Sequence, residues 1–127
     1  MSSPVDGRAV VEGYFAAINS DSFADLAEVF TDDVEIHTVG AEPVVGREAA
    51  LAHFPAVLAN YAEHEDRVTR WIETPEAIVT EIDFEGKLAD GRPVVFSALD
   101  VFDLRGGRIA RVTTWYDTRD VRRQVRP

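Results

Sequence analysis

The chain has 127 residues, 46% of them hydrophobic and 28% charged, and a formal net charge of −10. This length and ordinary composition predict one globular domain over residues 1–127. They exclude collagen-like and disordered chains. Residues 105–127 hold seven Arg against two Asp, a balance of +5, whereas residues 1–104 hold six Lys or Arg against 21 acids, a balance of −15. Because an acidic body repels phosphate backbones, we expect no nucleic-acid partner.

Several kinds of site lack their sequence signals. There is no cysteine, and His37, His53 and His64 do not have a metal-ligand spacing, so no metal site is predicted. No glycine-rich nucleotide motif or G-x-S-x-G nucleophile motif is present, so we expect no cofactor and no serine hydrolysis. The sequence shows no signal peptide and no apolar run of about 18 residues. We therefore expect a soluble cytoplasmic protein without a membrane partner.

The first third of the chain has helical periodicity. Val10, Tyr14 and Ile18 recur at i, i+4 and i+8, which predicts a helix that ends at residues 19–21. Its predicted start has Ser3 as N-cap, Pro4 at the first helical position and Asp6 in the first turn. A second, short helix is predicted over residues 22–30, where an i, i+3, i+4, i+7 apolar pattern occurs.

The next elements are a strand and a third helix. Residues 34–39 alternate as a strand does, and residues 40–43 are predicted to form a loop. Residues 47–61 have a helical stripe, but Pro55 removes a backbone donor, so a kink or break is expected near Phe54.

The second half of the chain changes to a period of two. Strands are predicted over residues 67–73, 77–88, 93–104 and 109–116, with turns at 89–92 and 105–108. Residues 117–127 are predicted to be an Arg-rich C-terminal tail, frayed at its end. Helices followed by hairpin-linked strands predict an α+β fold, in which three N-terminal helices cover the concave face of a curved antiparallel sheet. This arrangement predicts a cone-shaped apolar pocket for a small hydrophobic molecule.

Asp100 is the most unusual polar residue, because it lies in the apolar segment 94–102. Strand alternation places it on one face with Phe96, Ala98 and Phe102. A carboxyl in such surroundings favours its neutral form, and a neutral acid can donate a hydrogen bond to a developing oxyanion. A solvated face or a satisfied buried polar group is the structural alternative.

Two further residues, Tyr14 and His37, could act with Asp100, and the last strand could supply part of the pocket wall. Tyr14 lies in the apolar stripe of the first helix, where its hydroxyl either serves a site or bonds to the backbone. His37 lies in the first strand and could act as an acid or base near neutral pH, although a strand histidine is more often merely exposed. Val112, Thr114 and Tyr116 would share one face of the last strand.

These segments together resemble a known family. Residues 9–19 resemble the opening helix of ketosteroid isomerases, including its Tyr, and residues 29–33 resemble a common Phe-x-Asp-Asp junction. Residues 40–46 are similar to the loop before the third helix, and residues 98–102 are similar to the strand that carries a protonated Asp. The chain thus resembles the SnoaL-like and ketosteroid isomerase-like branch of the nuclear transport factor two-like superfamily, from about Val10 to Tyr116.

The resemblance implies roles for particular residues. Tyr14 and Asp100 would form an oxyanion hole. The family's catalytic Asp base has no carboxylate counterpart here: His37 takes its position when the segment is aligned from the right, and Thr38 when it is aligned from the left. His37 is the proposed base, and Glu35 is a candidate only if the strand register shifts.

The implied function is proton transfer and enolate stabilisation on a steroid- or polyketide-like carbonyl compound, by an isomerase, cyclase or dehydratase that needs no cofactor. The predicted substrate-binding walls are aromatic: Phe54, Trp71, Phe84, Phe102 and Tyr116. A non-catalytic ligand-binding module and an epoxide hydrolase with an ionised Asp100 are the alternatives. An apolar outer face of Leu99, Val101 and Trp115 predicts a homodimer.

Overall fold

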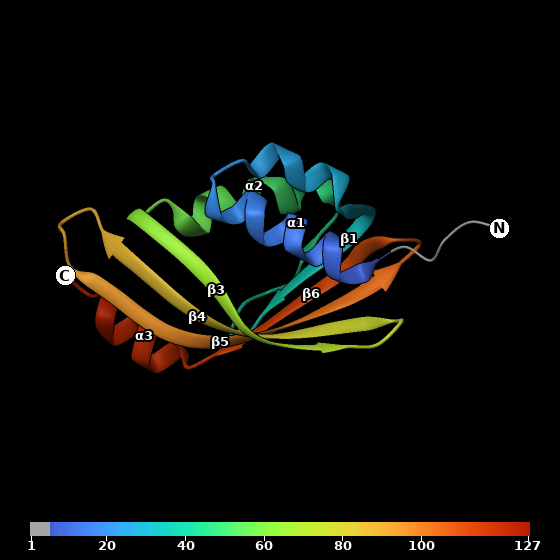
Figure 1. Ribbon diagram of the computed structural model, residues 1–127. Helices are drawn as coiled ribbons and strands as arrows, with labels where there is room; N and C mark the ends of the chain where they lie inside the picture. Colours follow the sequence, from blue (N-terminus) through green and yellow to red (C-terminus); the bar gives the residue numbers. More distant parts are fainter. Residues whose placement is uncertain (1–5) are drawn as a thin grey trace.

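The computed structural model describes residues 6–127 as three helical elements on one face of a curved six-stranded sheet (Figure 1). The helical elements are α1 (Gly7–Asn19), the 3₁₀ helix η1 (Phe23–Glu28) and α2 (Arg47–Leu58). The strands are β1 (Phe30–Thr38), β2 (Val44–Val45), β3 (Tyr61–Glu73), β4 (Ala77–Leu88), β5 (Pro93–Arg105) and β6 (Arg108–Tyr116). The last helix, α3 (Thr118–Val125), lies against the opposite face of the sheet (Figure 1). The α+β fold class is confirmed.

The strand order is β2-β1-β6-β5-β4-β3, and it contains one parallel pair. β3, β4, β5 and β6 form antiparallel neighbours through the predicted turns, whereas β1 pairs with β6 in parallel. The sheet is therefore mostly antiparallel, as predicted, with one parallel pair that the sequence did not indicate. The reason is topological: α2 and the three strands after it intervene before the chain returns beside β1.

The start of α1 differs from its prediction. Asp6 is the N-cap residue, and its carboxylate accepts hydrogen bonds from the backbone N–H groups of Arg8 (3.0 Å) and Ala9 (3.4 Å). Asp6 therefore does not lie in the first turn. The predicted roles of Ser3 and Pro4 fall outside the described residues.

The other helical boundaries also differ from their predictions. The second helix is a 3₁₀ element that ends at Glu28, and Phe30 already begins β1. α2 continues through Pro55 without a break, because the helix ends only three residues later and loses little from the missing donor. Tyr61 begins β3 rather than ending α2. The two-residue strand β2 was not predicted.

The C-terminal tail is helical rather than frayed. Asp117 caps α3 by accepting from the backbone N–H of Asp120 at 3.0 Å. Gln124 then fixes the helix to the edge of β5: its Oε1 accepts from Val95 N at 2.9 Å, and its Nε2 donates to Val95 O at 2.8 Å. Val125 adds an apolar contact to the cluster of Phe84, Leu88 and Val94, although no residue of α3 is fully buried.

The core lies between the sheet and the helices. Its fully buried large side chains come from η1, β1, β4, β5 and β6: Leu26, Phe30, Ile78, Phe102 and Ile109. α1 adds a buried stripe of Val11, Tyr14, Phe15 and Ile18, as its periodicity predicts. No helix within residues 6–127 is both long enough and apolar enough to cross a membrane.

Candidate active site

Asp100 lies on the inner face of β5, as the strand alternation predicts. Its side chain is only 5% exposed, and its Oδ1 accepts a hydrogen bond of 2.6 Å from the hydroxyl of Thr114 on β6. Burial raises the pKa of Asp100 from 3.8 to about 7, the Thr114 bond lowers it, and the negative charge of Asp66 raises it. Asp100 can therefore hold a proton close to neutral pH and donate it in a hydrogen bond.

Tyr14 reaches the same region from the middle of α1. Its ring is 5% exposed and makes edge-to-face contacts with Phe102 at 5.0 Å and Phe54 at 5.7 Å. Burial raises the pKa of the Tyr14 hydroxyl well above its usual value, and the charges of Asp100 and Asp66 raise it further. The hydroxyl is thus a neutral donor, and it makes no hydrogen bond to another residue in the range 6–127.

Asp66 on β3 is a third acidic group of this site, and the sequence analysis missed it. Its side chain points inward with those of His64 and Val68, while their neighbours along the strand are exposed. Burial raises the pKa of Asp66 from 3.8 to about 6, and the His64 charge lowers it. A carboxyl with this pKa can accept and return a proton near neutral pH.

The end of α1 holds this part of β3 in place. The Asn19 side chain bonds the Asp66 backbone twice, accepting from its N–H at 2.8 Å and donating to its carbonyl at 2.9 Å. In the turn that follows α1, Asp21 accepts a 2.7 Å hydrogen bond from Nε2 of the 6% exposed His64. Asp66 is therefore fixed on both sides by the segment that follows Tyr14.

Asp66 and Asp100 face each other across an apolar stretch of the sheet. Asp66 pairs with Phe84 of β4, and Asp100 pairs with Thr80, so their partners are four residues apart. The charge of Asp66 nevertheless raises the pKa of Asp100, so the two carboxyls are near enough to interact across the concave face. The paired side chains between them are apolar: Val68, Ile82 and Ala98. The two carboxyls thus flank an apolar floor rather than sharing a hydrogen bond.

His37 is not brought to this site. Val34 and Ile36 are the core residues of β1, so His37 lies on the outer face, where its Nε2 is 2.9 Å from Glu35 Oε1. The assignment of His37, or of Glu35, as the base beside Tyr14 and Asp100 is corrected by this alternation. Thr38, by contrast, pairs with Thr114 and shares the Asp100 face.

The five predicted wall residues divide into two aromatic groups. Phe54 and Phe102 contact the Tyr14 ring directly, and Trp71 contacts Phe15 at 6.5 Å. Phe84 and Tyr116 belong to a second group farther along the sheet, and both contact the ring of Phe96, at 4.6 and 5.5 Å. Phe102 is wholly buried and serves as core. The half-buried Tyr116 and Phe96 give the site its accessible aromatic side.

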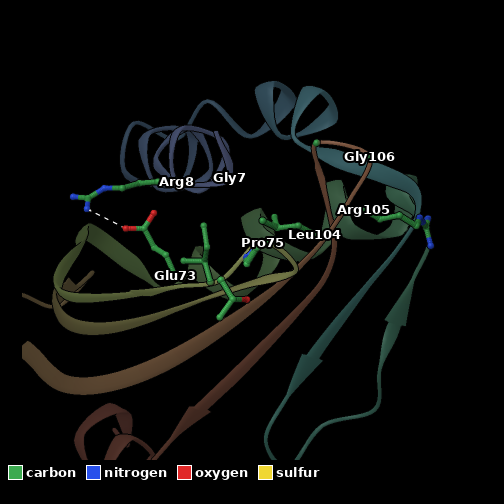
Figure 2. Close-up of a pocket in the computed structure, with 10 residues that line it drawn as sticks. Gly7, Arg8, Glu73, Pro75, Leu104, Arg105 and Gly106 are labelled. Atoms are coloured by element: carbon green, nitrogen blue, oxygen red, sulfur yellow. Dashed lines mark ion pairs between the residues drawn. The ribbon is translucent and has the colours of Figure 1, made fainter. Parts of the chain in front are cut away.

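Two cavities of the described chain lie elsewhere. One, of about 540 Å³, lies between the start of α1, the β3–β4 turn and the β5–β6 turn, and Arg8 pairs there with Glu73 at 3.5 Å (Figure 2). The other, of about 730 Å³, borders the start of α2. Neither is lined by Tyr14, Asp66 or Asp100. Within residues 6–127, no three acidic or histidine side chains are grouped to hold a metal ion.

A curved sheet covered on one face by N-terminal helices is the architecture of the nuclear transport factor two-like class of proteins. Residues 11–112 match the SnoaL-like domain family, and the chain belongs to that family. Comparison with curated protein sequences gives no match.

Solved structures with this fold are numerous and distant in sequence. A nuclear transport factor two-like protein of unknown function from Burkholderia pseudomallei has a TM-score of 0.88 at 17% identity, over 95% of this chain and 98% of the other. A SnoaL-like protein assigned as a polyketide cyclase, from a Jannaschia species, has a TM-score of 0.87 at 16% identity, over 100% of this chain and 99% of the other. An epoxide hydrolase of M. tuberculosis has a TM-score of 0.80 at 19% identity, over 94% of this chain and 88% of the other. At these identities the likeness shows the fold, and the similar proteins include cyclases and epoxide hydrolase-like enzymes.

Proposed function

We propose that this protein is an enzyme that moves a proton on a small hydrophobic carbonyl compound, with Asp66 as the base. The observation that carries the proposal is the convergence of three acidic groups, Tyr14, Asp66 and Asp100, on the inner face of the sheet. Burial raises the pKa values of all three groups, to about 6 for Asp66, about 7 for Asp100 and well above the usual value for Tyr14. Asp66 is the more accessible of the two carboxyls, so we assign it as the base and Tyr14 and Asp100 as the proton donors.

The first step is proton abstraction. The Asp66 carboxylate takes a proton from the carbon next to the substrate carbonyl, and the electron pair of that C–H bond moves into the carbonyl to form an enolate. Tyr14 and Asp100 donate hydrogen bonds to the oxygen on which the negative charge develops. These donors act in surroundings that exclude water, where each hydrogen bond stabilises charge more than it would in solution.

The second step decides the reaction class. If protonated Asp66 returns its proton to a different carbon, the net reaction is isomerisation. If the enolate carbon attacks a second carbonyl, a carbon–carbon bond forms, the π bond of that carbonyl breaks, and its oxygen takes the proton back from Asp66, which is an aldol cyclisation. The apolar floor of Val68, Ile82 and Ala98 suits a flat hydrophobic substrate in either case.

The electrostatics of Asp100 also bear on the alternatives. Epoxide hydrolysis would use Asp100 as the ionised carboxylate, and because burial raises the pKa of Asp100 to about 7, this reaction should speed up as the pH rises through 7. A ligand-binding module without turnover would not need a base, and the experiment below separates it from an enzyme.

The test is hydrogen–deuterium exchange into carbonyl substrates in deuterated buffer, followed by NMR. Exchange reports proton abstraction whatever the final product is. The panel contains cyclic enones, steroid enones and polyketide-like β-diketones. We expect exchange above the buffer rate in the wild type, and a loss of about 100-fold or more in Asp66→Asn, as is usual for removal of a general base.

His37→Gln is the matched control, since it removes a titratable side chain from the outer face of β1. We expect it to keep the wild-type exchange rate. Wild-type exchange in Asp66→Asn would overturn the assignment of the base. Tight binding of a panel compound with no exchange in the wild type would establish the non-catalytic alternative instead.

A further inference from the structure

Thr80 on β4 carries a buried hydroxyl that the fold does not use. Its side chain is 0% exposed, and its Oγ1 has no hydrogen-bond partner among the described residues, which makes it the one buried side-chain polar atom of that set left unpaired. Its neighbours on the same face, Ile78 and Ile82, are apolar core residues. An unpaired buried hydroxyl destabilises a protein, so valine would serve the fold better at this position.

The hydroxyl lies in a polar row across three strands. Thr80 pairs with Asp100 on β5, and Asp100 pairs with Thr114 on β6, so all three side chains point to the same face. Thr114 uses its hydroxyl on Oδ1 of Asp100. Oδ2 of Asp100 makes no hydrogen bond within residues 6–127. Paired residues on neighbouring strands have Cβ atoms about 5 Å apart, so the unused Thr80 hydroxyl and the unused carboxyl oxygen are neighbours on the inner face of the sheet.

We propose that Thr80 is a third donor of the site, and that its hydroxyl and Asp100 together hold one oxygen atom of the bound ligand. This inference rests on the proposed function and adds a residue to it. The fold tolerates the unpaired hydroxyl because a ligand oxygen satisfies it. Trp71, which pairs with Thr80 on the other side, then bounds the ligand beside that oxygen.

The inference makes Thr80→Val informative, because the change removes the oxygen atom and little else. In the ligand-free protein we expect the variant to be more stable, with a thermal midpoint raised by about 3 °C. The matched control is Thr113→Val, the same chemical change on the outer face of β6, which we expect to lack this gain. Thr80→Ser keeps the hydroxyl and should bind ligand like the wild type.

Ligand recognition is measured with two probes, 2-naphthol and naphthalene, by fluorescence titration. Both are flat and apolar, and only 2-naphthol has an enol-like oxygen. We expect Thr80→Val to weaken 2-naphthol binding about tenfold, the effect of one hydrogen bond, and to leave naphthalene binding unchanged. Thr113→Val should change neither.

Each outcome has a distinct meaning. Higher stability with unchanged 2-naphthol affinity would overturn the role of Thr80 alone, leaving it a structural imperfection. Lower stability of Thr80→Val would also overturn it, because the hydroxyl would then have a partner in the ligand-free protein. Failure of the wild type to bind either probe would overturn this inference and the proposed hydrophobic site together.

Discussion

Replacing Asp100 by Asn should stabilise the protein, and the gain should depend on pH. The carboxyl of Asp100 is buried among core side chains, and this burial raises its pKa from 3.8 to about 7. At a pH between these two pKa values, the folded protein keeps the Asp100 proton, whereas the unfolded chain has released it. The stability of the wild type therefore falls as the pH rises from about 4 to 7, and stays level above.

The size of the effect follows from that shift. A raised pKa of about three units corresponds to roughly 4 kcal/mol of lost stability above pH 7, since each unit is about 1.4 kcal/mol. This is an upper limit, because the protein can relax around the charge. Asn cannot ionise, and its Oδ1 can still accept the hydrogen bond from Thr114. We expect Asp100→Asn to match the wild type near pH 4 and to exceed it by a few kcal/mol at pH 8.

Urea denaturation between pH 4 and 8 measures this difference, with the fluorescence of Trp71 in the packed interior as the signal. Asp83→Asn is the control, because Asp83 lies on the outer face of β4 and is paired with Arg67 at 3.3 Å. A stability difference between Asp100→Asn and wild type that does not change with pH would refute the argument from burial. So would a lower stability of the variant at pH 8.

Two further predictions concern how the site and the assembly are built. Asn19→Ala should lower the free energy of unfolding by about 2 kcal/mol, because it removes two partly buried hydrogen bonds to the Asp66 backbone, and it should slow deuterium exchange into the substrate. Urea denaturation and the exchange assay check this, and equal rates would show that Asn19 does not position Asp66. The outer face of the sheet presents Leu99 and the 54% exposed Trp115, and we propose that it forms a homodimer. Sedimentation velocity should give a dimer that Trp115→Lys dissociates, and a monomeric wild type would contradict the proposal.

Asp66 shows why part of the site could not be predicted from local patterns. In a regular strand every second side chain points to the same face. Counted back from the inward-facing Trp71, Thr69 and Arg67 would then point inward and Asp66 outward. The register of β3 shifts between Val68 and Arg70, and this bulge inverts the alternation, so that Asp66 points inward. The predicted strand also began only at Arg67. Asp66 lies in a run of charged residues, and such a run gives no local indication that one of its side chains is buried.

His37 shows the converse error. Its chemistry suits a base, and the resemblance left two alignments of β1 open. The parallel register, in which Ile36 pairs with Val112 and Thr38 with Thr114, places Thr38 and not His37 on the inner face. The face of the sheet to which a side chain points therefore decided whether the residue belongs to the site, and its chemical type did not.

The amino-acid sequence by itself determined the α+β class, the four long hairpin strands, the buried stripe of α1 and the inward direction of Asp100. All of these depend on periodicity and turn residues within a single element. The tertiary structure alone decided the pairing of β1 with β6, the inward turn of Asp66, the unpaired hydroxyl of Thr80 and the docking of the Arg-rich end as α3. These features depend on contacts between distant segments, such as Asn19 with Asp66 and Gln124 with Val95, which no local pattern encodes. The −15 charge of the body is thus mostly solvated surface, and the acids to which we assign a function are the two that the fold buries.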